Sequence, residues 1–597
     1  MRTFALHQTP KRATPSFFTL LLFTTLVLGI QSIVQAQDNC IDVETVEIVP
    51  GSGGSFPENF TAVGDKVFFE AEGATIGREL HIYDCSAPVG SELEVVDINP
   101  NGDAFNDPPD FTTVGDKVFF AATGATGATE LHIYDCSAPV GSELEVVEVP
   151  VGSGSITAVG DKVFFNSGGP QVGNELFFYD CSAPVGSELE VVDIWLGPGS
   201  TFPTEITAVG DKVFLSAFGP TINRELFIYD CNAPPGSELD SVDINPNGNS
   251  NPDFFTPVGD KVLFAAEGAT IGRELYIYDC SAPPGSELDS VDINPNGFSF
   301  PFSLTAVGDK VLFAAQGVNI GRELYIYDCG APAGSELEVV DINPGADGSF
   351  PDDFAAVGDK AFFAATSATL GRELYIYDCS APPGSELDSV DINPNGDAFL
   401  GVDPDFAVVG EKVFFAAIGA TGETELYIYD CSAPVGSELE VVDIDLGSNS
   451  IFTVTMAAVG DKVFFSADDG TVGEELFIAT CLSEDEAGFT YPADVCIDDM
   501  NPIATITGIT GGNFSVDNGA TIDPVTGELD LSTTTEGTTY TVTYTSNNIG
   551  TCGPFEQMVT VTSCAIVPTM GEWGVLCLSL LLMIMGVVVM RQKEFIY

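Results

Sequence analysis

The sequence is poor in basic residues. Its 597 residues include 19 Lys and Arg against 88 Asp and Glu, which gives a formal net charge of -69. A phosphate backbone or an anionic headgroup is not attracted to such a surface, so we expect no nucleic acid partner. The charge favours cations, cationic surfaces or a salty medium. The alternative is a solvated acidic exterior that keeps the protein soluble.

Histidine is scarce as well. The chain has only His7, His81 and His132, and the last two occupy a position that is Tyr in related segments. No segment gathers a nucleophile, a base and an orienting acid, which a catalytic site requires. We therefore predict no catalytic residues and no enzyme activity, although carboxylate pairs for glycoside hydrolysis stay open among so many acids.

A convincing helical period is also missing from the body of the chain. The body instead repeats one unit, typified by VGDKVLFAAEGATIGRELYIYDC (258–280). Its last residue recurs roughly every 50 residues, a spacing typical of propellers and solenoids. The nine copies end at Cys85, Cys136, Cys181, Cys231, Cys280, Cys329, Cys379, Cys431 and Cys481.

Each unit contains short apolar runs bounded by turn residues. We predict strands at FTPV (255–258), KVLFAA (261–266), ELYIYD (274–279) and SELDSVDI (286–293). The second run is apolar on both pleat faces, which fits a small sheet between two similar sheets. Residues 38–51 begin in mid-repeat, and the last copy lacks its fourth strand. The N-terminal strand is therefore predicted to complete the last blade and close a β-propeller of about nine repeats.

The run DINPGADGSFPDDFAAVGDKAFFAATSATLGRELYIYD (341–378) resembles bacterial surface repeats that have an ELW-x-x-DGT core followed by a DINPG segment. Tyr375 stands in place of the usual Trp, and Cys379 and Ser380 stand where the DGT turn would continue. The resemblance covers roughly residues 40–485. It implies a propeller-like fold in a secreted protein of poorly defined function.

Loops between the repeats alternate oxygen-bearing side chains before a glycine turn, as the first half of a calcium loop does. The candidate calcium ligands are Asp97, Asn99, Asn101 and Asp103 in one loop and Asp391, Asn393, Asn395 and Asp397 in another. No Glu stands at the twelfth position, which is Pro108 in the first loop. The alternative is that Asn-Pro-Asn-Gly is turn chemistry that ends an outer strand.

Two further residues recur in the units. The single Cys of each repeat is predicted to be a half-buried thiol, because equivalent positions of neighbouring blades should lie too far apart for a disulfide. Pairing between blades is the alternative. The recurring Arg is followed by Glu in each case and is expected to bridge neighbouring carboxylates. Its copies are Arg78, Arg224, Arg273, Arg322 and Arg372.

The ends of the chain differ from its body. Residues 1–36 combine early basic residues with an apolar run (17–30) and are predicted to be a secretory signal peptide, so the propeller domain spans 37–484. Residues 485–565 show closely spaced alternating strands, predicted to form a small β-sandwich, and the segment 501–532 resembles immunoglobulin-like modules. Cys496 and Cys552 are the preferred disulfide, with Cys564 as the alternative partner.

Residues 566–597 combine a short motif, an apolar helix and a basic end. The stretch 573–590 is predicted to span a membrane, with Arg591 and Lys593 just inside. The order resembles IPTL-type C-terminal sorting domains of Gram-negative bacteria. The residues that carry the resemblance are Val567, Pro568, Thr569, Glu572, Trp573 and Gly574. It implies a membrane sorting protease as a partner, and a permanent single-span anchor is the alternative.

The fold class expected is therefore all-β: a large propeller, a small immunoglobulin-like sandwich and one C-terminal transmembrane helix. The leading functional hypothesis is an exported, non-catalytic binding or adhesion scaffold at a Gram-negative cell surface or outer membrane. Calcium is its one candidate cofactor. Its unknown extracellular ligand would be a glycan, a matrix component or a cell-surface protein. The alternatives are a secreted polysaccharide-active enzyme with a site in the propeller funnel and a purely structural surface-layer protein.

Overall fold

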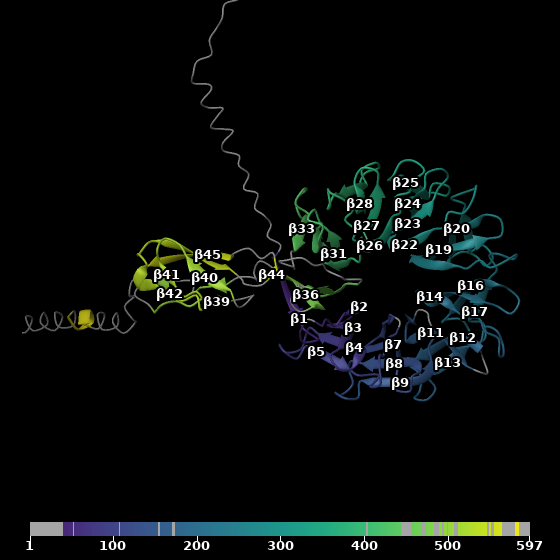
Figure 1. The fold of residues 1–597 in the computed structure, drawn as a ribbon, viewed down its shortest axis with the longest axis horizontal. Helices are drawn as coiled ribbons and strands as arrows, with labels where there is room; N and C mark the ends of the chain where they lie inside the picture. Colours follow the sequence, from purple (N-terminus) through teal and green to yellow (C-terminus); the bar gives the residue numbers. More distant parts are fainter. Residues whose placement is uncertain are drawn as a thin grey trace, which may run out of the picture. The chain divides into compact units, whose positions relative to one another are not determined.

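The structure is a computed structural model, and the residues that it describes are 40–51, 53–106, 108–152, 156–169, 173–400, 404–442, 455–468, 473–482, 489–491, 495–497, 500–506, 512–545, 549–550, 555–563 and 579–583. Within these ranges, nine antiparallel sheets of the propeller type follow one another along the chain. Figure 1 shows them arranged around a common centre. We call each sheet a blade, and its strands A to D from the centre outward.

The strands of the nine blades fall into four equivalent sets. The A strands are β2 (Glu58–Val63), β6 (Thr112–Val114), β10 (Thr157–Val159), β14 (Thr204–Val209), β18 (Asp253–Val258), β22 (Phe302–Val307), β26 (Asp352–Val357), β30 (Ala407–Val409) and β34 (Ala457–Val459). The B strands are β3 (Lys66–Gly73), β7 (Lys117–Thr123), β11 (Lys162–Gly169), β15 (Lys212–Phe218), β19 (Lys261–Gly268), β23 (Lys310–Gln316), β27 (Lys360–Ser367), β31 (Lys412–Ile418) and β35 (Lys462–Asp468). The C strands are β4 (Gly77–Asp84), β8 (Thr129–Asp135), β12 (Gly173–Asp180), β16 (Arg224–Asp230), β20 (Gly272–Asp279), β24 (Arg322–Asp328), β28 (Gly371–Asp378), β32 (Thr424–Asp430) and β36 (Glu474–Leu482). The D strands of blades 1 to 8 are β5 (Leu93–Val96), β9 (Leu144–Pro150), β13 (Leu189–Val192), β17 (Leu239–Val242), β21 (Leu288–Val291), β25 (Leu337–Val340), β29 (Leu387–Val390) and β33 (Leu439–Val442).

The B strands form the buried middle of the blades, as the sequence predicts. In β19 the residues from Val262 to Ala266 are all fully buried. One pleat face packs against the preceding blade, so that Val262 and Phe264 share a cluster with Phe214 and Leu226 of blade 4. The other face packs within its own blade and against the next one. Each blade therefore buries its apolar surface only between two neighbours, which is the stabilising arrangement of a propeller.

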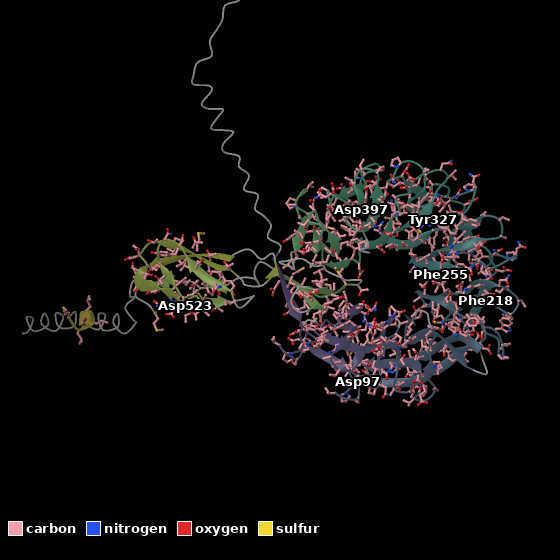
Figure 2. All side chains as sticks on the ribbon, viewed as in Figure 1. Asp97, Phe218, Phe255, Tyr327, Asp397 and Asp523 are labelled. Carbon is pink, nitrogen blue, oxygen red and sulfur yellow. The ribbon has the colours of Figure 1, made fainter. Side chains whose placement is uncertain are left out.

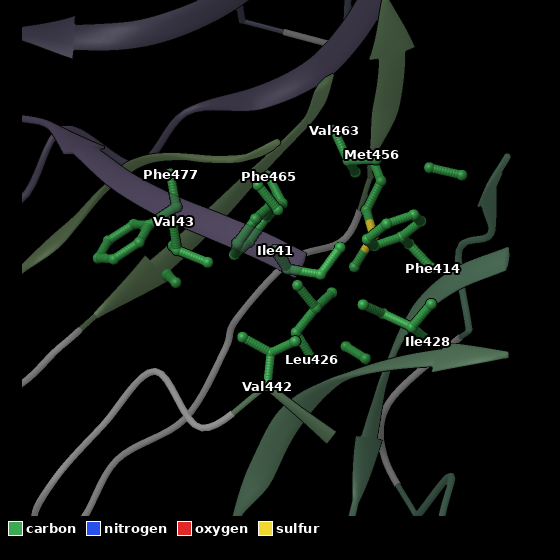
Figure 3. Packing of buried hydrophobic residues seen from close by; sticks show 14 residues of the cluster. Ile41, Val43, Phe414, Leu426, Ile428, Val442, Met456, Val463, Phe465 and Phe477 are labelled. Carbon is green, nitrogen blue, oxygen red and sulfur yellow. The ribbon is translucent and has the colours of Figure 1, made fainter. Parts of the chain in front are cut away.

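The N-terminal strand closes the ring. β1 (Cys40–Val46) pairs antiparallel with β36 over its whole length and supplies the D strand of blade 9. Ile41 and Val43 are buried there among Phe465, Phe477 and Val442 (Figure 3). Residues of blade 9 and blade 1 share a further cluster, so the last blade packs against the first. The predictions of a ring closed by this strand and of about nine repeats are both confirmed.

A recurring backbone link ties each blade to the next. Ser250 donates its N–H to Arg224 O of blade 4 at 2.9 Å, and its carbonyl accepts from Glu267 N of blade 5 at 2.7 Å. The link lies at the entrance to strand A, on the same end of the blade as the turn between strands B and C. We call this end the loop end. Equivalent links are made by Ser55, Ala104, Thr201, Ser299, Ser349 and Ala398.

The C-terminal region has a core of its own, in which Phe514, Leu529 and Tyr544 are buried together. Its sheets consist of β37 (Phe489–Thr490), β38 (Val495–Cys496), β39 (Thr505–Ile506), β40 (Asn513–Val516), β41 (Thr521–Ile522), β42 (Leu529–Asp530), β43 (Thr539–Thr545) and β45 (Phe555–Thr562), with a 3-10 turn at Leu531–Thr533. β44 (Ile549–Gly550) pairs with β1. The region is thus a small β domain, as expected, and its immunoglobulin-like character stays a prediction.

The predicted membrane span lies almost entirely outside the described residues. Of 573–590, the structure describes 579–583, which are helical. Within the described ranges, no helix has the length and apolar character needed to cross a membrane. Residues 1–36 and the sorting motif at 567–574 also lie outside these ranges, so the signal peptide and the sorting signal stay predictions.

Candidate ligand-binding site

In seven blades the Glu of the RELYIYD-type segment holds the loop that leaves its blade. Glu79 is fully buried, and its Oε2 accepts Ile98 N at 2.7 Å and Asn99 N at 3.2 Å. Six equivalents are also fully buried: Glu175, Glu225, Glu274, Glu323, Glu373 and Glu475. Burial raises the pKa of Glu79 to about 7, because hydrogen bonds from backbone N–H groups offset the lost hydration only in part. These carboxylates are therefore structural groups.

The recurring Arg beside this Glu is fixed at the loop end. Arg78 pairs with Glu58 at 2.6 Å and with Glu70 at 2.9 Å, and two of its equivalents bind one carboxylate each, in the pairs Arg273–Asp253 and Arg372–Asp352. The prediction that these Arg residues bridge carboxylates is confirmed for those three.

Two copies of this Arg depart from the pattern. Arg224 donates to the hydroxyls of Thr204 and Ser216. Arg322 instead lies over the ring of Phe302, with its guanidinium carbon 4.6 Å from the ring centroid. Within the described chain, Arg322 Nε has no hydrogen-bond partner. Burial lowers the pKa of Arg322.

Half-exposed Phe residues mark the loop end. Phe56, Phe202, Phe300 and Phe350 each precede a Pro at the entrance to strand A and have φ between 45° and 48°. Bulky side chains rarely adopt this left-handed conformation, which costs of order 1 kcal/mol or more. Yet these rings are 38 to 53% exposed, so packing of the ring does not explain the strain. Three of these Phe carbonyls accept from the Arg of their own blade at 3.1 to 3.2 Å: those of Phe56, Phe202 and Phe350.

The exposed aromatic rings can therefore be removed without loss of stability. Blade 5 has Asn251 at the same position with φ 42°, and Asn tolerates this conformation better than Phe. Phe350→Asn is expected to leave the free energy of unfolding unchanged or to raise it by up to about 1 kcal/mol, measured by denaturant unfolding. Phe350→Ala, which lacks this tolerance, is the control. A loss above about 1 kcal/mol in Phe350→Asn would show that the ring has a packing role.

An open pocket of about 470 Å³ lies at the loop end where blade 5 meets blade 6. We call it the junction pocket. It is lined by Asn294, Asn296, Gln316, Gly317, Val318, Asn319, Gly321 and Ala346. The first two belong to the loop that leaves blade 5, and Gln316 to Gly321 form the turn between strands B and C of blade 6, which is closed by Gly317 N–H donating to Gly321 O at 2.9 Å. The volume falls within the range of small-molecule sites.

Amide side chains dominate this pocket. Asn294 is used by the loop itself, since its Nδ2 donates to Phe298 O at 3.2 Å. The side chains of Asn296, Gln316 and Asn319 are exposed, and the described residues offer them no hydrogen bond. In two other blades the counterpart of Asn296 is occupied: Asn395 Nδ2 donates to Ala420 O of the next blade at 3.1 Å, and Asn101 does the same to Ala125 O.

Two exposed aromatic rings lie on the same loop. Phe298 and Phe300 are each 46% exposed, and their ring centroids are 5.4 Å apart. The position of Phe298 is Asp103, Asn249 or Asp397 in other blades. The junction of blades 5 and 6 therefore combines free amides with an aromatic pair. An exposed apolar patch beside convergent polar groups is a common mark of a binding site.

The predicted calcium residues lie in the loops that leave blades 1 and 7. Figure 2 shows Asp97 toward the outer edge of the ring, whereas Phe255 of β18 lies toward its centre. Asn99 Oδ1 accepts Asn101 N at 3.3 Å, and Asp103 Oδ1 accepts Arg78 N at 3.0 Å. In the second loop Asn393 Oδ1 accepts Asn395 N at 3.2 Å, and Asp397 Oδ1 accepts Arg372 N at 2.9 Å. Asp97 and Asp391 precede these turns. The oxygens thus serve the turn, and among described residues no group of three acidic, Cys or His side chains could hold a metal. Calcium binding stays a prediction.

The opposite end of the blades carries the recurring Cys. All nine are free and partly buried, which confirms the thiol prediction over pairing between blades. Cys280 N donates to Asp260 O at 2.8 Å, and burial raises the pKa of its thiol. Lys and Asp pair beside it in several blades, as in Lys162–Asp180 at 2.7 Å. Such protonated thiols are chemically quiet.

The remaining predicted residues are placed as follows. His81 and His132 are buried strand residues stacked on Phe69 and Phe120. Cys496 is disulfide-bonded. Its candidate partners Cys552 and Cys564 lie outside the described residues, so the pairing stays a prediction. A separate pocket of about 240 Å³ near the A strands is lined by Asp353 and Asp405.

Sequence reasoning missed the junction pocket and the way in which Arg322 departs from the other recurring Arg residues. The signal is in the differences between repeats: Gln316 stands where blades 1 and 5 have Glu72 and Glu267, and Phe302 stands where they have Glu58 and Asp253. A position-by-position comparison of the copies would have shown that blade 6 has lost acids that its siblings keep.

No protein-family model matches the chain, and no curated protein matches it either. Solved structures that resemble it include one from a structural and mechanistic study of two prolyl endopeptidases, with 13% identity, 68% of this chain and 56% of that chain covered, and a TM-score of 0.36. Another is apo prolyl oligopeptidase B from Galerina marginata, with 13% identity, coverage of 65% and 56%, and a TM-score of 0.36. A third is a puromycin-hydrolyzing peptidase from Mycobacterium tuberculosis, with 12% identity, coverage of 56% and 53%, and a TM-score of 0.33. The match spans little more than half the length of each of these proteins.

These comparisons correct the functional hypothesis. The similar solved structures are peptidases, which contradicts a non-catalytic adhesion scaffold, and that prediction is withdrawn as wrong. At these TM-scores the likeness carries no argument about the activity of this chain. The function has to be argued from the residues of the site.

Proposed function

We propose that the chain binds a saccharide in the junction pocket between blades 5 and 6. The observation that carries this proposal is the set of three solvent-facing amides in the pocket, Asn296, Gln316 and Asn319. The exposed pair Phe298 and Phe300 lies on the loop that leaves blade 5, outside the pocket lining. Each amide offers both donors and an acceptor, which matches hydroxyl groups that also donate and accept. An aromatic face packs well on the apolar C–H face of a sugar ring, and Phe offers that face at low entropic cost.

The charge pattern favours this ligand over a cationic one. Blades 1, 5 and 7 keep a carboxylate beside the recurring Arg, at Glu58, Asp253 and Asp352. At blade 6 the same position is Phe302. A cationic ligand would therefore be bound better at any of those blades than here. Binding at one pocket needs neither display at a cell surface nor many weak contacts, so it differs from the adhesion scaffold rejected above.

A saccharide array tests the proposal. The full-length chain is expected to bind a subset of immobilised oligosaccharides, and calorimetric titration with a soluble hit should give one site. Asn319→Ala and Gln316→Ala should each weaken binding about fivefold to tenfold, because a lost hydrogen bond costs roughly 1 kcal/mol. The matched controls are Thr270→Ala and Glu267→Ala, at the positions of blade 5 that correspond to Asn319 and Gln316. Equal losses in the controls, or no saccharide bound, would reject the pocket.

We also propose that the protein is exported and carried to the cell envelope. Support comes from the basic and apolar pattern of residues 1–36 and from the motif and apolar run of 566–597. The C-terminal β domain at 485–565 would then be an immunoglobulin-like spacer, and a sorting protease would act at the tail.

A further inference from the structure

We infer that the ligand of the junction pocket is an acidic saccharide, one that carries a uronic acid whose carboxylate binds Arg322. This inference rests on the proposed function, since it names the class of saccharide for the same site. It begins from the difference between Arg322 and its equivalents in other blades.

Arg322 lacks both of the acids that lie beside Arg78 and Arg273, and unlike Arg224, which also lacks them, it has no hydroxyl partners in their place among the described residues. On the inner side, Phe302 replaces the acid that pairs with Arg78, Arg273 or Arg372. Across the sheet, Arg322 lies opposite Gln316, whereas Arg78 lies opposite Glu72 and Arg273 opposite Glu267. The blade therefore presents an unbalanced guanidinium in a chain whose formal charge is -69.

The register places Arg322 next to two residues that line the pocket, while Arg322 itself is not a lining residue. Residues directly opposite in an antiparallel pair point to the same face of the sheet, so Arg322 and Gln316 share a face. Gln316 and Gly321 both line the pocket. The neighbouring acid Glu323 points to the other face, where its carboxylate accepts Ile342 N at 2.9 Å and Ser349 N at 3.0 Å. It is thus already used and does not balance Arg322.

A carboxylate is the anion that this geometry suits. The planar guanidinium lies over the Phe302 ring and leaves its N–H edge for a partner in the plane. Carboxylates can bind that edge with two parallel hydrogen bonds, whereas the sibling Arg residues make one contact to each of their carboxylates. A partly buried cation without a counter-ion is costly, so a ligand carboxylate would restore the balance. Screening in physiological salt limits repulsion from acids more than about 8 Å away.

The test compares two forms of one ligand. Oligogalacturonates, and the same oligomers after carboxyl reduction to neutral galactose units, are titrated into the full-length chain by calorimetry at physiological salt. The acidic form is expected to bind about tenfold more tightly than the reduced form, and the difference should shrink as salt is added.

Two variants at the site isolate the charge. Arg322→Gln should weaken binding of the acidic oligomer to the affinity of the reduced oligomer. The affinity for the reduced oligomer should stay unchanged. Phe302→Asp restores the carboxylate of the sibling blades, so it should keep the fold and also abolish the preference. Arg224→Gln, at the equivalent position of blade 4, is the control and should bind like the unchanged chain. Thermal melts of all variants check the fold.

The outcomes separate the inference from the proposed function. Tighter binding of the acidic form that is lost in both variants supports the inference. Equal binding of the two forms, or a preference that survives in Arg322→Gln and Phe302→Asp, overturns the acidic class and keeps a saccharide site. Binding of neither form, together with an empty saccharide array, overturns both.

Discussion

Ile41→Ala is expected to lower the free energy of unfolding of the ring by about 2–5 kcal/mol. Ile41 is 1% exposed and lies in the core between blades 8 and 9, among Leu426, Ile428 and Phe465 (Figure 3). The loss combines the removed apolar contact with a cavity that the surrounding strands fill only in part. Because β1 closes the ring, the effect should extend beyond blade 9 to its contact with blade 1.

Thr45→Ala provides the matched control for ring closure. Thr45 lies on the same strand but is exposed, so its replacement should change stability by less than about 0.5 kcal/mol. Denaturant unfolding followed by far-UV circular dichroism measures both variants, and hydrogen exchange shows whether β2 and β34 lose protection together. If Ile41→Ala were as stable as Thr45→Ala, β1 would not be the element that closes the ring.

The fold could be predicted from the sequence because the near-identical copies repeat the same order of apolar strands and turn residues. The run 261–266 is apolar at successive positions, and β19 is indeed buried on both faces. The mid-repeat start at residues 38–51 predicted the pairing of β1 with β36, which the register confirms. Boundaries were less exact: 286–293 was predicted as a strand, but β21 covers Leu288–Val291, because Glu274 bends the backbone after it into the next loop.

The site could not be predicted in the same way. Repeats reveal what the blades share, whereas a binding site depends on what one blade changes. Gln316 and Phe302 are ordinary residues one by one, and only the strand register shows that both face Arg322. The left-handed Phe residues were also hidden, since a Phe before Pro gives no sequence sign of positive φ. The calcium hypothesis followed oxygen spacing, and it stays a prediction; in the first loop Asn99 Oδ1 and Asp103 Oδ1 accept backbone N–H groups of Asn101 and Arg78.

The buried glutamates give the protein an unusual dependence on pH. Burial raises the pKa of Glu79, Glu175 and Glu373 to about 7. Each also has an acid nearby, Asp97, Asp193 or Asp391 respectively, which acts in the same direction. In the unfolded chain such a Glu titrates near its ordinary value of about 4.3. The folded state therefore holds more protons than the unfolded state between about pH 4.5 and 7.

The contribution of these groups to the free energy of unfolding is thus expected to be fully present below about pH 4.5. It should be lost as the pH rises through 7. Each Glu contributes on the order of 3 kcal/mol, at about 1.4 kcal/mol per unit of pKa difference. His81 acts oppositely, since burial lowers its pKa to about 4, so its contribution is present above pH 6.5 and lost on acidification. Three glutamates outweigh one histidine, so the combined contribution of these groups is largest near pH 4.5 and falls as the pH rises through 7.

The melting temperature should accordingly fall between pH 5.5 and pH 8, in contrast to a protein whose carboxylates are stabilised by ion pairs. The triple variant Glu79→Gln, Glu175→Gln and Glu373→Gln keeps an acceptor for Ile98 N and its equivalents but cannot ionise. It should melt higher than the unchanged chain at pH 8 and show a shallower fall with pH, because burial still raises the pKa of Glu225, Glu274, Glu323 and Glu475. Replacing the half-buried Glu92, Glu188 and Glu386 by Gln tests whether relief of the overall negative charge is responsible. Only the buried Glu side chains lose their hydration on folding, so the surface variant should leave the pH dependence unchanged. If the surface variant flattened the profile as strongly as the triple variant, long-range repulsion rather than the buried carboxyls would set the pH dependence.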